Sequence, residues 1–205
     1  MAFPFLGLFL LFIFILTYQI KKNDKKQKES EENFWNREAE ANHVRRQDIS
    51  GLSYITIPFE KFPINLSDDE ELKSYEADLQ ALSEKKILNL TGISNTDLKL
   101  QYGPANLPEL SEYDQNYTKL AQTLVQYAKC LIHNGYEKEA VPVLEFAIET
   151  GSDISSTYTM LADYYKKTGN TDGMNHLFDA AEHLTSLMKQ PILDKLNHIA
   201  QSACP

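Results

Sequence analysis

The chain has 205 residues, with 29 acidic and 20 basic side chains, so its formal net charge at pH 7 is −9. This length allows one modest globular domain with appendages. Because nucleic-acid binding requires a basic surface, the acidic balance predicts no nucleic-acid partner. The only cysteines, Cys130 and Cys204, are too few for a disulfide framework and are typical of a reducing compartment.

Residues 2–20, AFPFLGLFLLFIFILTYQI, contain no charged side chain. Their length is near the lower limit for a helix that crosses the hydrocarbon core of a membrane. Lysines follow in residues 21–28, whereas a signal peptide has basic residues before its apolar run and a small-residue cleavage site after it. We therefore predict an uncleaved, single-pass transmembrane anchor. A cleaved signal peptide with a secreted domain remains the alternative.

The lysines after the span also predict its direction. Positive residues that flank a span stay on the cytoplasmic side, so we expect the N-terminus outside and the C-terminal domain in the cytoplasm. The Asn-x-Ser/Thr triplets at Asn65, Asn89 and Asn116 are then chance matches rather than glycosylation sites.

Residues 21–48 are polar and rich in Glu, Lys, Ala and Arg, which predicts a helical juxtamembrane linker. Phe34 and Trp35 are its only large aromatic residues. They either pack against the protein's own domain or form a docking point for another chain.

Residues 49–120 are predicted to be a packing segment without repeats. The stretch 52–66 is β-branched and aromatic, and its two prolines forbid an ordinary helix or a central strand, so we expect an extended ribbon. Apolar residues at helical spacing predict a helix over 69–90. Glycines and prolines then predict a long irregular loop over 91–111.

Residues 121–188 repeat with a period of 34 residues. Gly135 and Gly169 mark the predicted turns, between helices 121–134 and 137–150 and between helices 155–168 and 172–188. The other matching pairs are Leu124 and Tyr158, Tyr127 and Leu161, Ala128 and Ala162, Leu131 and Tyr165, Leu144 and Phe178, and Ala147 and Ala181. A period of this length is typical of stacked two-helix repeats.

The pattern over residues 121–188 resembles the tetratricopeptide repeat (TPR) family. Met174 replaces the usual alanine, and Ser152 and Ser186 stand where proline is common. The resemblance implies an all-α fold of two TPR-like helix hairpins that binds other chains. Two repeats are fewer than a free-standing stack needs, so flanking helices must add burial, among them a capping helix at 192–203.

The C-terminal segment 189–205 as a whole is assigned to this cap. The complete layout also resembles small membrane-anchored proteins of Gram-positive bacteria, which implies a bacterial plasma membrane. That wider resemblance brings no function with it.

In the TPR family the first helix of each repeat lines a concave groove. By this register the candidate partner-binding residues are Gln122, Gln126, Lys129, His133, Thr159, Asp163, Lys166 and Lys167. They imply hydrogen bonds and charge pairs to a protein or peptide, and the three lysines favour a peptide carboxylate. The groove is open, or it is filled by residues 52–66, or these residues are simply solvated.

No motif for catalysis, a cofactor or a metal emerges from the sequence. Cys130 with His133, and His176 with His183, lack further ligands at suitable spacing. We therefore expect a membrane-anchored, cytoplasm-facing scaffold or adaptor for a protein or peptide partner, with no enzyme activity, cofactor or metal.

Two other functions remain open. The first is an enzyme or small-ligand-binding protein whose loop 91–111 presents Thr91, Ser94, Asn95, Thr96 and Asp97. The second is a membrane protein that forms a homo-oligomer through residues 21–48 and the span.

Overall fold

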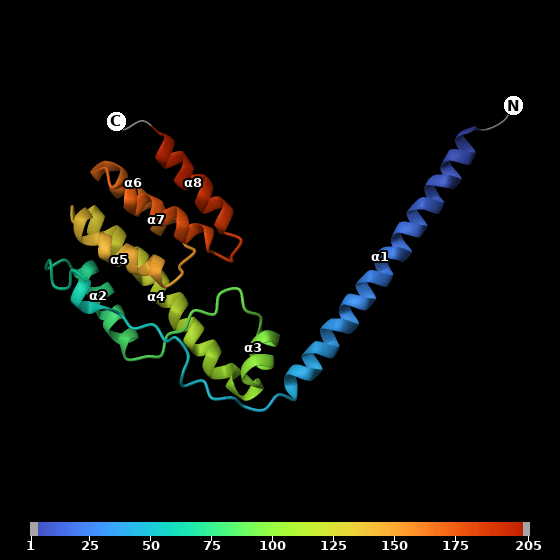
Figure 1. The fold of residues 1–205 in the computed structure, drawn as a ribbon, viewed down its shortest axis with the longest axis horizontal. Coiled ribbons are helices and arrows are strands. Elements are labelled where there is room, and N and C mark those ends of the chain that lie inside the picture. The colour runs from blue at the N-terminus through green and yellow to red at the C-terminus, as the bar shows by residue number, and fades with distance from the viewer. Residues whose placement is uncertain (1–3, 203–205) are drawn as a thin grey trace. The chain divides into compact units, whose positions relative to one another are not determined.

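The computed structural model describes the backbone of residues 4–202 and the side chains of residues 7–202. Within this range the fold is all-α and contains no strand, which confirms the all-α part of the predicted fold class (Figure 1). The helices are α1 (Pro4–Asn42), α2 (Glu70–Ser83), α3 (Asn95–Tyr102), α4 (Leu107–His133), α5 (Glu137–Glu149), α6 (Ser155–Thr168), α7 (Thr171–Glu182) and α8 (Lys189–Gln201). Short 3₁₀ turns, η1 (Phe59–Lys61) and η2 (Pro104–Asn106), lie between them.

The chain forms two compact units. The first joins the segment that ends at Asp48 to Ser94–Leu107, so it contains α1, α3 and η2. The second joins Ile49–Ile93 to the segment that begins at Pro108 and contains the remaining helices.

In the first unit, polar contacts attach the end of α1 to α3. Arg37 pairs with Asp97, and Glu38 pairs with Lys99 and accepts a hydrogen bond from Thr96 at 2.7 Å. Hydrogen bonds from Lys99 and Thr96, together with the positive charge of Lys99, lower the pKa of the Glu38 carboxyl. The Glu38 side chain is therefore ionised when it binds Thr96 and Lys99 of α3.

Asn106 fixes the other end of the first unit. Its side chain is fully buried and donates to the backbone oxygens of Gln47 at 2.8 Å and Tyr102 at 2.7 Å, while Arg46 Nε donates to its Oδ1 at 2.8 Å. A buried amide with all of these partners defines one local arrangement of the chain.

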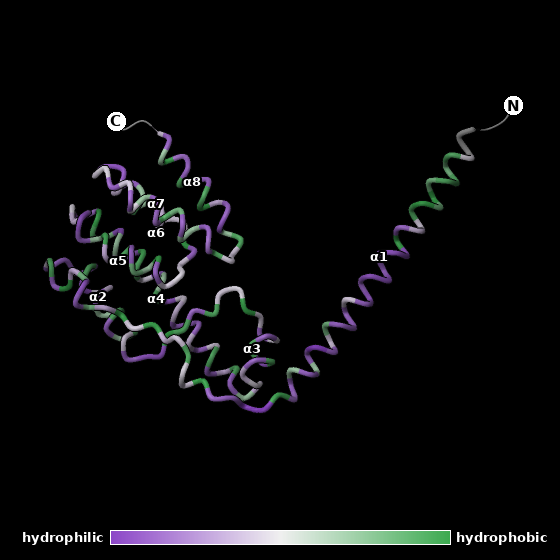
Figure 2. The backbone as a smooth tube through the Cα atoms, in the orientation of Figure 1, coloured by the Kyte–Doolittle hydropathy of each residue, from purple (hydrophilic) through white to green (hydrophobic). Residues whose placement is uncertain are grey.

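Residues Leu8 to Ile20 of α1 are largely apolar (Figure 2). Their large hydrophobic side chains are exposed, with exposures between 42% and 70%. Among the described residues, no helix is long and apolar enough to cross a membrane. The predicted span, residues 2–20, begins in a stretch that lies outside the described residues. The predicted linker helix is part of α1 and ends at Asn42.

The repeated alanines lie at the centre of the second unit. Ala128, Ala147, Ala162 and Ala181 are all 0% exposed. Small side chains at these points let helices approach closely, and α6 accordingly packs against α5, α7 and α8.

Three helices of the second unit end in the same way. Gly135, Gly151 and Gly169 have φ of 86°, 81° and 68°, in the left-handed region that favours glycine. One residue beyond each glycine, a backbone N–H bonds to a carbonyl five residues earlier: Tyr136 to Leu131 at 2.8 Å, Ser152 to Ala147 at 3.1 Å, and Asn170 to Tyr165 at 2.9 Å. This is the Schellman closure.

The stretch 52–66, predicted to be an extended ribbon, forms neither a helix nor a strand apart from the turn η1, and the chain turns at Asn65, which has a φ of 58°. Ile57 and Phe62 are buried in the common core, and the Phe62 ring meets the Phe146 ring of α5 at 5.5 Å between centroids. Tyr127 Oη on α4 donates to the Pro63 carbonyl at 3.0 Å. The ribbon therefore supplies burial that two hairpins alone lack.

The prediction of a helix over 69–90 is wrong at its C-terminal end, since α2 stops at Ser83. Ile87 O accepts from Ile55 N at 2.9 Å, and Leu88 N donates to Tyr113 O at 3.2 Å. These buried residues run as an extended segment because hydrogen bonds to the ribbon and to α4 replace those of a helix.

The loop predicted over 91–111 is also wrong, because α3, η2 and the start of α4 occupy most of it. Ser94 Oγ accepts from Asp97 N at 3.2 Å and so caps α3, and Gly103 ends this helix with φ of 86°. The helix predicted at 172–188 ends at Glu182, and the cap predicted from 192 begins at Lys189. Pro191 fits inside α8 because a first turn needs no N–H donor.

We predict that Gly135→Ala lowers the free energy of unfolding by about 1 kcal/mol through backbone strain alone, since an added Cβ meets no atom within 4 Å. Gly151→Ala should cost more, because the added Cβ would lie 2.9 Å from Asn89 Nδ2, which donates to Thr150 O. Urea unfolding followed by circular dichroism measures both. Gly51→Ala is the control, since Gly51 has neither a positive φ nor a close neighbour. Equal stability of all three variants would contradict this account.

Candidate functional site

The residues predicted to line a peptide groove lie on α4 and α6. On α4, Gln122, Gln126, Lys129 and His133 are exposed, so the ribbon does not cover them. On α6, Asp163 and Lys167 are exposed, whereas Thr159 and Lys166 are half-buried.

Two of the three groove lysines have partners within the second unit. Lys166 Nζ donates to Ile199 O and Ser202 Oγ, each at 2.6 Å, and also to Ser202 O. Lys167 Nζ pairs with Glu137 of α5 at 2.8 Å. Lys166 thus caps the C-terminus of α8, where carbonyls lack helical partners, and α8 takes the contact that the sequence assigned to a peptide.

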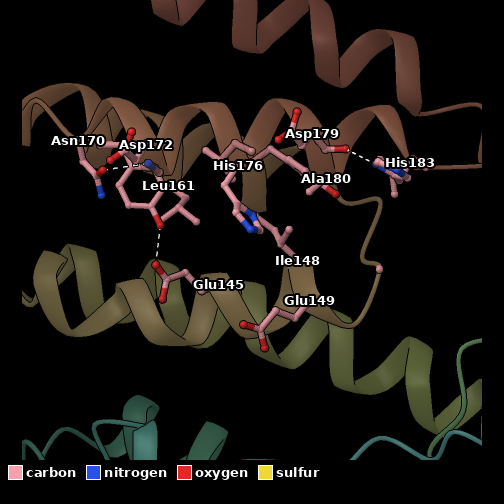
Figure 3. Close-up of a pocket in the computed structure, with 16 residues that line it drawn as sticks. Glu145, Ile148, Glu149, Leu161, Asn170, Asp172, His176, Asp179, Ala180 and His183 are labelled. Carbon is pink, nitrogen blue, oxygen red and sulfur yellow. Dashed lines mark hydrogen bonds between the residues drawn. The ribbon is translucent and has the colours of Figure 1, made fainter.

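A different concavity lies between α5 and α7 (Figure 3). Its volume is about 850 Å³, and residues of α6 also line it. We call it the α5–α7 cleft. It is lined by Glu145, Ile148, Glu149, Gly151, Tyr158, Leu161, Tyr165, Asn170, Asp172, Gly173, His176, Leu177, Asp179, Ala180, His183 and Leu184.

Tyr165 fixes one end of the cleft. Its hydroxyl donates to Glu145 Oε1 at 2.6 Å and so joins α6 to α5. A Cβ on Gly173 would lie 2.8 Å from the Tyr165 ring, so the absence of a side chain there lets α7 pass over the ring. Burial first, and then Glu145, raises the pKa of Tyr165, which keeps the donor protonated.

The floor of the cleft is apolar. Leu161 and Leu177 are almost fully buried, and Tyr158 is 1% exposed. Within the described part of the chain the Tyr158 hydroxyl has no hydrogen-bond partner. Desolvation raises its pKa to about 12, so it is a neutral phenol.

The rim of the cleft is acidic. It carries Glu145 and Glu149 from α5 and Asp172 and Asp179 from α7, and none of the described lining residues is Lys or Arg. In Figure 3, His176 projects from α7 toward α5. Carboxylates beside a low-dielectric floor concentrate a negative potential in the space between them.

The described residues contain no group of three or more His, Cys, Asp or Glu placed to hold a metal ion. With an apolar floor and an acidic rim, the cleft can bind an apolar group together with positive charge.

The polar residues of segment 91–111 make local contacts. Ser94 caps α3, and Thr96 and Asp97 contact α1. Thr91 N donates to Asn89 Oδ1 at 2.9 Å. The hydrogen bond from Ser94 and the nearby Arg37 lower the pKa of Asp97, as expected for a structural ion pair.

Comparison with protein families, with curated proteins and with solved structures finds no match to this chain. The assignment of the cleft as the candidate site therefore rests on its geometry. In the sequence its only signal is the spacing of carboxylates, four residues apart on α5 and seven apart on α7.

We predict that Lys166→Met loosens the C-terminal half of α8 without unfolding the unit, because the last carbonyls of α8 lose a charged donor. Hydrogen exchange of the last α8 amides should accelerate about fivefold, which corresponds to about 1 kcal/mol. Lys195→Met, at an exposed position of α8, is the control. The same exchange rates in both variants would show that Lys166 does not hold this helix.

Proposed function

We propose that this protein is a membrane-attached helical scaffold that binds a protein partner through the second unit. The α5–α7 cleft carries the proposal, because it combines an apolar floor with a charged rim. Such a combination is typical of binding sites: the floor supplies affinity and the polar groups supply orientation.

The TPR-like character of the second unit is part of this proposal. The period of 34 residues, the four buried alanines and the repeated Schellman turns support it. Proteins of this architecture present helix faces to other chains rather than a reacting group.

Membrane attachment through residues 2–20 is the second part of the proposal. The exposed apolar side chains of α1 support it, since such a surface requires an apolar environment. The lysines in residues 21–28 would then lie at the head groups, with the second unit in the cytoplasm.

We predict that the full chain, expressed in bacteria, remains in the membrane fraction after alkaline carbonate extraction. Replacing Leu11 and Phe14 by Arg should release most of it, because each charge opposes burial in hydrocarbon by about 3 kcal/mol. Replacing Asn23 and Gln27 by Arg, farther along α1, is the control. Equal retention of both double variants would contradict the anchor.

We predict that the variant with Ser30→Cys and Cys204→Ser does not react with an impermeant maleimide in intact cells, because residue 30 follows the span on its cytoplasmic side. It should react once the cells are lysed. Cys130 is buried and should not react. Reaction in intact cells would show that residue 30 lies outside the cell and would contradict the proposed orientation.

We predict that a photo-crosslinking amino acid at His176, in the cleft, captures a discrete protein partner in cells. The same residue at Gln126 tests the predicted groove, and Gln80 on α2, which is exposed, is the control. Capture from Gln126 alone would move the site to the groove. The same products from all three positions would contradict both sites.

A further inference from the structure

We propose that the partner segment bound in the α5–α7 cleft is basic, with Lys or Arg side chains one helical turn apart and an apolar side chain between them. This rests on the proposed function and names the chemistry of the partner. The observations behind it are the unpaired carboxylates of the rim and their spacing above an apolar floor.

Most of the rim charge is available to a ligand. Glu145 uses Oε1 to accept from Tyr165, and among the described residues its Oε2 accepts no hydrogen bond, so this side chain can still meet a cation. Among the described residues, the side chains of Glu149, Asp172 and Asp179 form no hydrogen bond or ion pair. A cationic ligand can therefore pair with these carboxylates.

The spacing of the carboxylates matches a helical ligand. Glu145 and Glu149 are one turn apart on α5, or about 6 Å at 1.5 Å per residue. Asp172 and Asp179 are about 10 Å apart on α7 by the same measure. Lysines at positions i and i+4 of a bound helix have the first of these spacings, so two charges can meet the rim together.

The floor selects what lies between the charges. Ile148, Leu161 and Leu177 line the cleft, and Ala180 leaves room beside them. A volume of about 850 Å³ holds several side chains, and burying one Leu or Phe there contributes about 2 kcal/mol. The ligand is therefore amphipathic, and a purely polar cation lacks the group that fills the floor.

The decisive measurement is the fluorescence anisotropy of a labelled peptide titrated with the full chain in a non-ionic detergent. The probe is an alanine-based helical peptide with lysine at every fourth position and leucines between the lysines. The matched peptide carries glutamate in place of lysine. We expect saturable binding of the lysine peptide, weakened by salt, and binding of the glutamate peptide at least about tenfold weaker.

Two pairs of variants locate this binding. Glu149→Lys with Asp179→Lys should weaken the lysine peptide about tenfold, whereas Glu84→Lys with Glu112→Lys, exposed residues outside the cleft with the same change in charge, should leave it within about twofold. Ala180→Trp fills the cleft without altering charge and should weaken binding about tenfold. Ala200→Trp, exposed on α8, should have no effect.

Several results would overturn the inference. These are equal binding of both peptides, equal weakening by both charge pairs, or equal affinity of Ala180→Trp and Ala200→Trp, each variant being checked for native circular dichroism. If Lys22→Glu with Lys26→Glu makes the probe bind more tightly, the lysine segment of a second copy competes for the cleft. That segment, rather than a different protein, would then be the ligand. If the lysine peptide does not bind while the crosslinker at His176 still captures a partner, the inference of a basic ligand is contradicted and the proposed scaffold function is not.

Discussion

Close packing around α6 is the constraint on which the second unit depends. Ala162 of α6, together with Ala147 of α5 and Ala181 of α7, is fully buried, and α6 packs against α5, α7 and α8. A larger side chain at Ala162 has no space to enter, since the interior is already filled.

The surroundings of α6 then divide by face. Tyr158, Leu161 and Tyr165 recur at helical spacing and form the floor of the α5–α7 cleft. Lys166 instead reaches the C-terminus of α8. One helix thus both contacts the C-terminal end of α8 and forms the floor of the α5–α7 cleft.

The sequence predicts the second unit best where local chemistry and period agree. Helices predicted at 137–150 and 155–168 are found at Glu137–Glu149 and Ser155–Thr168, because left-handed glycines end α6 and follow α5 closely. Prediction fails where distant contacts decide. Ile87 and Leu88 have helical spacing, yet they extend because backbone partners on the ribbon and α4 are available. The partner of Lys166 depends on the position of α8, and the spacing of residues in the sequence does not give that position. The cleft likewise arises from the packing of α5 and α7, and a list of carboxylates does not reveal it.

A charge swap tests whether the rim carboxylates contact basic residues of the ligand. The affinity of the glutamate peptide is measured for the unmodified chain and for the variant with Glu149→Lys and Asp179→Lys. We expect the variant to bind the glutamate peptide about tenfold more tightly than the unmodified chain does, because the exchanged charges then attract each other. Equal affinity of the two proteins for this peptide would contradict contact at the cleft.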